Sequence, residues 1–188
     1  MRALTTILLI AAIHGQAEAL VPTLFGVRPD STVRFPEVEG SNLEGRRFSL
    51  PNDFGGELNI VLVAFRREQQ DDVNTWAPFL EATAGKHPAV RAYELPTLNR
   101  SYRIVRGFID GGMARGLPEK AARETTITLY IDKAPFKKTL GINSEDAIVT
   151  MLVSRDGRVL WRADGRHTAE AAADLAAEIE RLTASSAP

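Results

Sequence analysis

The sequence predicts an α/β domain with a mixed central sheet and helices on both of its faces. Residues 58–65 form an almost unbroken apolar run rich in β-branched side chains, which is typical of a strand covered on both faces. A helical pattern and a second strand pattern at residues 89–94 follow it, which together predict a right-handed βαβ unit. Near the C-terminus, two strand patterns flank a tight turn and precede a helix, so a hairpin should extend the same sheet.

The composition is that of an ordinary folded chain, and it excludes several classes of function. Of 188 residues, 44% are hydrophobic and 25% are charged, and the formal net charge is −1. A chain without a basic excess has no field that gathers phosphate backbones, so we expect no nucleic-acid partner. The sequence contains no cysteine. Disulfides, thiolate metal sites, thiol peroxidase chemistry and a cysteine lipid anchor are therefore excluded.

The first residues predict a secretory signal peptide at residues 1–19. Arg2 precedes a short apolar run, and Ala17-Glu18-Ala19 has the small-x-small pattern of a cleavage site. The run is shorter than the ~20 apolar residues that a membrane-spanning helix needs. We therefore expect an exported protein, periplasmic or secreted, with an uncleaved N-terminal anchor as the alternative.

The rest of the chain shows no internal repeat and no long linker, so one domain is the simplest organisation. An extended arm is expected at residues 20–32, the domain at 33–183 and a flexible tail at 184–188. A small β-hairpin is expected within residues 42–50, before the central strand at 58–65.

The segment after the central strand predicts a helix from about Val73 to Gly85. Pro78 should kink this helix or mark its first turn, and Thr75 is an alternative N-cap. After the strand at 89–94, apolar residues spaced by four, three and four from Leu98 to Ile109 predict an amphipathic helix that stops at Gly111-Gly112.

The last third of the domain carries clear turn and capping signals. A helical stretch at 118–124 and a strand at 127–131 should come first. A short helix follows, with Asp132 as its cap, Pro135 in its first turn and Gly141 at its end. The final hairpin should turn at Ser154-Arg155-Asp156-Gly157, and Thr168 should cap a last helix.

In this order, the elements resemble the thioredoxin-like fold over about residues 33–183. The early hairpin and the segment inserted before the third strand resemble its peroxiredoxin and thiol-oxidoreductase branch. That resemblance implies a reactive cysteine pair just after the central strand, about where Gln70 and Val73 stand. It also implies a cis-proline before the strand that faces the active site, and residues 145–148 contain no proline. The scaffold is therefore expected without its redox chemistry.

Two short motifs carry a closer resemblance. The first is Ala64-Phe65-Arg66-Arg67-Glu68-Gln69-Gln70 with Trp76, Pro78 and Phe79 after it, and the second is residues 157–165 followed by a helix. They resemble the Atp10 family, whose members are thioredoxin-like, lack the catalytic cysteines and assist assembly of a membrane subunit of the mitochondrial ATP synthase. The resemblance implies an assembly or binding module for a protein client, whose identity stays open.

The candidate partner-binding residues are Arg66, Trp76, Arg100, Arg103 and Arg106. The last three arginines repeat every three residues beside an apolar helix face, so they can contact an acidic partner or anionic lipid headgroups. A solvated helix face is the alternative. Trp76 can anchor a partner or pack in the core, where its helical spacing from other apolar residues also fits.

No catalytic residue, cofactor or metal site is predicted. His87 and His167 lack the local spacing of metal ligands, and no nucleophile elbow or phosphate loop is present. An enzyme using Asp71, Asp72 or His167 in the former thiol cleft is the alternative function. A third possibility is that the arginine stripe contacts a membrane surface or another copy of the chain.

Overall fold

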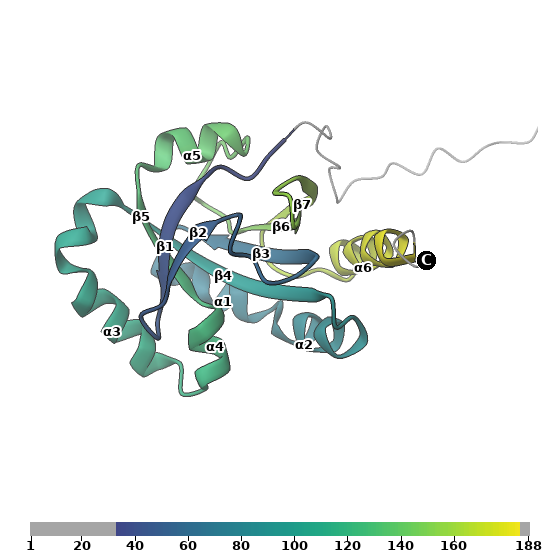
Figure 1. Ribbon diagram of the computed structural model, residues 1–188, viewed down its shortest axis with the longest axis horizontal. Coiled ribbons are helices and arrows are strands. Elements are labelled where there is room, and N and C mark those ends of the chain that lie inside the picture. The colour runs from purple at the N-terminus through teal and green to yellow at the C-terminus, as the bar shows by residue number, and fades with distance from the viewer. Residues whose placement is uncertain (1–32, 185–188) are drawn as a thin grey trace, which may run out of the picture.

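The computed structural model describes residues 33–184 (Figure 1). The predicted signal peptide, the predicted extended arm and residues 185–188 of the predicted tail lie outside the described residues. Within residues 33–184, no helix is both long and apolar enough to cross a membrane.

A mixed sheet of seven strands forms the centre of the described part of the chain, in the order β2-β1-β5-β4-β3-β6-β7. Strand β4 pairs in parallel with β3 and with β5, and the remaining pairs are antiparallel. The predicted α/β class, mixed sheet and N-terminal hairpin are confirmed. The strands are β1 (Val38–Asn42), β2 (Arg47–Leu50), β3 (Leu58–Ala64), β4 (Val90–Asn99), β5 (Ile127–Ile131), β6 (Val149–Ser154) and β7 (Val159–Asp164).

Helices cover both faces of this sheet, as expected (Figure 1). One apolar cluster lies under α1, α2 and α6, and a second lies on the other face under α5. The helices are α1 (Gln70–Asn74), α2 (Ala77–Lys86), α3 (Arg106–Gly116), α4 (Lys120–Thr125), α5 (Lys133–Thr139) and α6 (Ala169–Ala184), with 3₁₀ turns η1 (Arg67–Gln69) and η2 (Arg100–Val105).

Strand β3, which was expected to be central, is an interior strand one position away from the middle of the sheet. All seven of its residues are buried, and it pairs with β4 on one side and β6 on the other. A strand enclosed on both edges and both faces needs an almost wholly apolar sequence, and its one polar side chain, that of Asn59, is hydrogen-bonded to the backbone of Gly56 and Val153. The middle position of the sheet belongs to β4, which is flanked by three strands on each side.

The helix expected at residues 73–85 is replaced by three shorter pieces. Helical turns begin at Arg67, and the chain breaks between α1 and α2 at Thr75 and Trp76. Pro78 lies in the first turn of α2, where its missing N–H leaves no helical bond unmade. Thr75 is not the N-cap: its hydroxyl donates to the Asp72 carbonyl (2.6 Å) and accepts from the His167 N–H (2.9 Å).

The helix expected between Leu98 and Gly112 is wrong at both ends. Strand β4 runs on to Asn99 because Leu98 pairs with Tyr130 of β5, so Leu98 belongs to the sheet. The chain then forms η2 and α3, and α3 continues to Gly116. Gly111 and Gly112 lie inside α3 without a positive φ, since a glycine weakens a helix interior without having to end it.

The capping and turn predictions of the last third are confirmed. Asp132 Oδ1 accepts from the Ala134 N–H and Thr168 Oγ1 from the Ala171 N–H, each at 3.1 Å. Gly141 follows α5 with φ +64°, and Gly157 closes the β6–β7 turn with φ +83°. These positive φ values favour glycine, which is why the two turns could be read from the sequence.

Candidate functional site

The turn after β3 is built around the buried amide of Gln69. Its Oε1 accepts from the backbone N–H groups of Phe65 (2.7 Å) and Arg66 (3.2 Å). Its Nε2 donates to the Glu145 carbonyl at 2.8 Å. One side chain therefore ties the start of η1 and α1 to the loop that precedes β6, and the polar groups of this turn are paired inside the protein.

Charged side chains from α5 and from the turn after β3 form ion pairs with the loop that precedes β6. Lys133 and Lys137 of α5 donate to the two carboxylate oxygens of Glu145, at 2.5 and 2.9 Å. Burial favours a higher pKa for Glu145, but the hydrogen bonds and charges of the two lysines outweigh it and lower that pKa. Arg66 donates to Asp146 at 2.6 Å, and hydrogen bonds from Ser144 and Arg66 lower the pKa of Asp146.

The start of α1 carries no thiol. Gln70, its first residue, is exposed, whereas Val73 is buried. Below them, burial raises the pKa of Glu94 on β4, and a hydrogen bond from Gln70 opposes that rise. The arrangement can hold a polar surface together, but it supplies no thiolate and no activated hydroxyl.

The Thr75 hydroxyl joins the Asp72 carbonyl to the His167 N–H, so two residues of the alternative enzyme lie near each other through their backbones. Asp71 and Asp72 lie on α1, while the His167 ring packs edge-on against Trp76 at 5.2 Å between ring centroids. In the part of the chain that the structure describes, no hydrogen bond or ion pair joins His167 to either aspartate, and no group of three or more His, Asp or Glu could hold a metal ion.

Trp76 is fully buried. Its indole packs edge-on against Phe79 and Trp161, and its Nε1 donates to the Gly165 carbonyl at 3.3 Å. A fully buried Trp76 packs in the core and cannot anchor a partner at the surface. Arg66, by contrast, has an exposed side chain at the sheet edge where β3 ends.

The three arginines of the inserted segment, residues 100–116, do lie together. A 3₁₀ helix has three residues per turn, so Arg100, Arg103 and Arg106 form one row, and all three line a pocket of about 430 Å³. Tyr102, Val105 and Phe108 have the same spacing and are exposed, as is Ile104. These four residues, which we call the apolar patch, are the exposed large hydrophobic residues among residues 33–184.

Comparison with known proteins shows which solved structures share the fold of this chain. No family model matches the sequence, and no curated protein matches it. The thioredoxin domain of a thiol-disulfide oxidoreductase from Bacteroides vulgatus superimposes with a TM-score of 0.55 at 18% identity, covering 79% of this chain and 96% of that one. Yeast Sco1 gives 0.55 at 12% identity, covering 85% and 99%. The fold is thioredoxin-like. A thiol:disulfide interchange protein from a Bacteroides species agrees, with a TM-score of 0.51 at 18% identity over 78% of this chain and 88% of that one.

Within the thioredoxin-like fold, the sequence analysis missed two residues around the start of α1, Gln69 and Glu94. Gln69 could not be distinguished from the neighbouring amide side chains, because no local pattern indicates its hydrogen bond to the Glu145 carbonyl, 76 residues away. Glu94 could have been noticed, because Val90, Ala92 and Glu94 are two residues apart and therefore share one face of β4. Val90 belongs to the apolar cluster under α2 and α6, and Ala92 packs against that cluster. A carboxyl on the apolar face of a strand is a residue that the pattern could have singled out.

Proposed function

We propose that this chain is an exported, redox-inactive thioredoxin-fold protein that acts as a binding or assembly factor for a protein partner, as its resemblance to the Atp10 family implies. The proposal places it in the periplasm or outside the cell, in keeping with the signal peptide expected at residues 1–19. The absence of cysteine supports the loss of thiol chemistry. The observation that carries the binding role is the apolar patch on η2 and α3.

The inserted segment is unusual in having no buried residue in either η2 or α3. Ile104 and Phe108 are 93% and 81% exposed, and both lie on this segment. Exposed apolar side chains that are grouped in this way are typical of an interaction surface, because burying them against a partner removes apolar area from water. The patch therefore supports docking of a partner protein.

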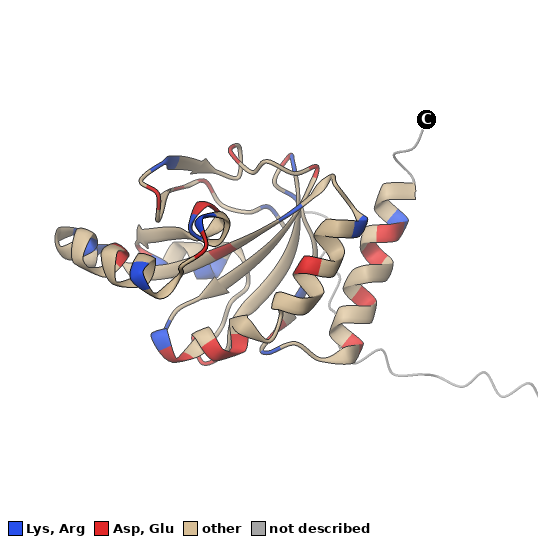
Figure 2. Ribbon diagram, turned by 90° about the horizontal axis from the view of Figure 1, so that it is seen from below, with Lys and Arg blue, Asp and Glu red and all other residues tan. Residues whose placement is uncertain are grey.

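Arginines border the patch and extend along the same edge of the sheet. Arg100, Arg103 and Arg106 form the neighbouring row of the segment. Arg66 lies at the same edge, because β3 and β4 are parallel and both end there. Figure 2 shows basic residues along the inserted segment, at the end of the molecule away from α6. The proposed partner thus presents an apolar surface with acidic groups around it.

Crosslinking in the native host tests this function. We expect a defined partner to be captured by the wild-type chain and to be lost, by roughly tenfold or more, from a double variant Ile104→Ser and Phe108→Ser. The matched control is Ala82→Ser on the exposed side of α2, which should capture as much partner as the wild type.

Three results would count against the proposal. Equal capture of the same partner by the double variant would remove the role of the apolar patch. Turnover of peroxide or reduction of insulin by the pure, metal-free protein would show an enzyme. Salt-sensitive binding to anionic vesicles in place of any protein would favour the membrane-surface alternative.

A further inference from the structure

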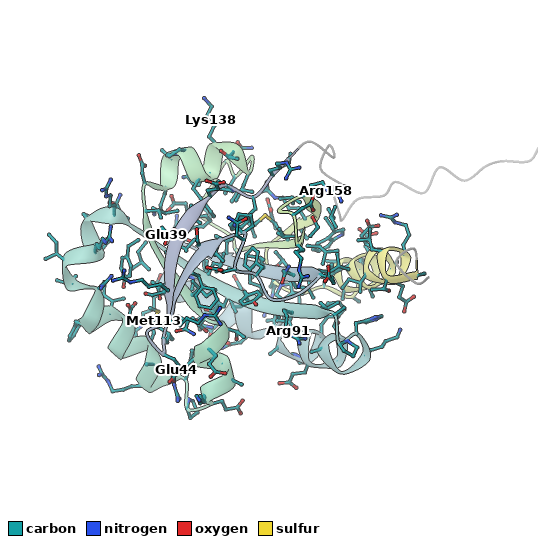
Figure 3. The ribbon with its side chains drawn as sticks, viewed as in Figure 1. Glu39, Glu44, Arg91, Met113, Lys138 and Arg158 are labelled. Atoms are coloured by element: carbon teal, nitrogen blue, oxygen red, sulfur yellow. The ribbon has the colours of Figure 1, made fainter. Side chains whose placement is uncertain are left out.

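A pocket of about 430 Å³ lies between the inserted segment and strands β1 and β5. Its volume falls in the range of small-molecule sites. Its walls come from β1, where Figure 3 labels Glu39, from the start of α5 and from η2 and α3. The pocket is separate from the former thiol cleft, since Gln69, Gln70 and Glu94 do not line it.

Three guanidinium groups line one wall of this pocket without a carboxylate partner. Arg100, Arg103 and Arg106 form no ion pair with any of residues 33–184, although other arginines, such as Arg123 and Arg158, are paired. Guanidinium groups offer several N–H donors in a fixed plane and bind phosphate or carboxylate oxygens well. A row of three is therefore a wall suited to an oxyanion with several acceptor oxygens.

The start of α3 adds to the positive potential of this wall. The helix has eleven residues and begins with Arg106, it has no acidic residue in its first turn, and no side chain caps it. A cation at a helix N-terminus is unfavourable, because the helix dipole places partial positive charge there. An anion bound in the pocket would offset both charges at once.

The floor of the pocket holds an unpaired hydroxyl. The Thr128 side chain is 1% exposed, and its Oγ1 has no hydrogen-bond partner among the described residues. A buried hydroxyl without a hydrogen-bond partner is unfavourable, so an acceptor oxygen that reaches Thr128 Oγ1 gains a hydrogen bond that the described residues do not provide. Next to it, the Tyr130 hydroxyl donates to Asp110 at 2.8 Å.

The opposite wall carries two carboxylates, and these limit the chemical groups that can be attached to the bound anion. Glu37, which immediately precedes β1, and Glu39 of β1 are exposed, line the pocket and form no ion pair with residues 33–184, and Arg47 of β2 also lines the pocket. Two carboxylates would repel a bare anion but can accept hydrogen bonds from hydroxyl groups. The pocket thus combines a wall for an oxyanion with a wall for hydroxyl donors.

We propose that this pocket binds a phosphate monoester of a small polyhydroxylated molecule, with the phosphate on Arg100, Arg103 and Arg106 and the hydroxyl groups on Glu37 and Glu39. This goes beyond the proposed function, because it needs no protein partner; it shares the arginine row with the proposed docking surface but does not use the apolar patch. The same chemistry occurs in a free metabolite and in a lipid headgroup.

Calorimetric titration of the full chain with glycerol 3-phosphate tests the site, with glycerol as the control ligand. We expect saturable binding of glycerol 3-phosphate at one site and none of glycerol. A second arm uses phosphatidylcholine vesicles that contain phosphatidylinositol 4-phosphate, whose headgroup carries a phosphate monoester on a polyhydroxylated ring. Binding in the first arm identifies a soluble ligand, and saturable binding in the vesicle arm alone identifies a lipid headgroup.

Charge-matched variants separate this pocket from general attraction of anions. Arg103→Gln and Arg106→Gln should each weaken binding about tenfold or more, since each loses a charge-assisted contact. Arg115→Gln removes the same charge from α3 outside the pocket and should leave binding unchanged. The proposal is overturned if neither arm shows saturable binding, or if Arg115→Gln weakens it as much as Arg103→Gln does. Its failure would leave partner capture by the apolar patch untouched.

Discussion

Glu94 lies on the face of β4 that carries Val90 and Ala92, and its backbone pairs with Leu62 of β3 and forms a β-bridge with Thr126. Burial raises the pKa of Glu94, because the charged form loses hydration there, and the hydrogen bond from Gln70 only partly opposes this. The folded protein therefore holds the Glu94 proton to a higher pH than the unfolded chain, whose reference pKa is 4.5. It follows that folding is weakened by this residue in neutral solution.

The variant Glu94→Gln should reveal the loss of folding stability that ionisation of Glu94 causes. The folded-state pKa is raised, so the native state binds more protons than the unfolded state above about pH 4.5, and stability falls as pH rises towards the folded-state pKa. The free energy of unfolding of Glu94→Gln minus that of the wild type should therefore increase over this window, by at most about 1.4 kcal/mol per pH unit. Urea denaturation at several pH values measures it, and a pH-independent difference would contradict it.

At the level of single residues, the sequence predicted the arginine row but not the hydrogen bonds by which Gln69 holds the turn after β3. The period of three in Arg100, Arg103 and Arg106 survives in the structure because η2 is a 3₁₀ helix with that period. The interaction of Gln69 with the loop before β6 could not be predicted, since it depends on two distant segments meeting at one sheet edge. Trp76 lies in the core, so the five candidate residues cannot all belong to one surface.

At the level of elements, local chemistry decided which predictions held. Caps and turns act over a few residues, so those at Asp132, Gly157 and Thr168 could be read directly. The helix expected after residue 98 failed because its apolar spacing also fits a strand end followed by a 3₁₀ turn. Pairing of β4 with β5 decides between the two, and no local pattern contains that information.

The β6–β7 hairpin offers a matched test of backbone geometry. Gly157 and Gly165 both have positive φ, at +83° and +94°. A Cβ at Gly157 would also lie 2.7 Å from Pro51 Cγ, whereas one at Gly165 meets no atom within 4 Å. Gly165→Ala should lower the free energy of unfolding by roughly 1–2 kcal/mol. Gly157→Ala should lower it by at least about 1 kcal/mol more, because Pro51 must move. Equal losses in thermal or urea denaturation would disprove the contribution of Pro51.

For the whole molecule, stability is concentrated in the sheet and its two apolar clusters. Residues 100–125 contain η2, α3 and α4, and none of these three has a buried residue. Strand β3, by contrast, is buried along its full length. The inserted segment and α4 therefore bury little surface against the core, to which they are joined by contacts such as the Tyr130–Asp110 and Asn42–Glu124 hydrogen bonds.

Amide hydrogen exchange should report this division. We expect the amides of α3 to exchange at least about a hundredfold faster than those of β3, because a helix that buries little surface opens locally without unfolding the core. Mass spectrometry of peptic fragments from the full chain measures both segments in one experiment. Similar protection of α3 and β3 would mean that the segment is part of the cooperative core.

The placement of the two tryptophans also determines what can be seen by optical methods. Trp76 and Trp161 are the tryptophans of this chain, both are fully buried, and they pack edge-on in the same cluster under α6. Intrinsic indole emission therefore monitors the α2 and α6 side of the sheet and carries no direct signal from the inserted segment. A reporter dye attached through a cysteine introduced into α3 would give that signal with a single labelling site, since the natural chain offers no competing thiol.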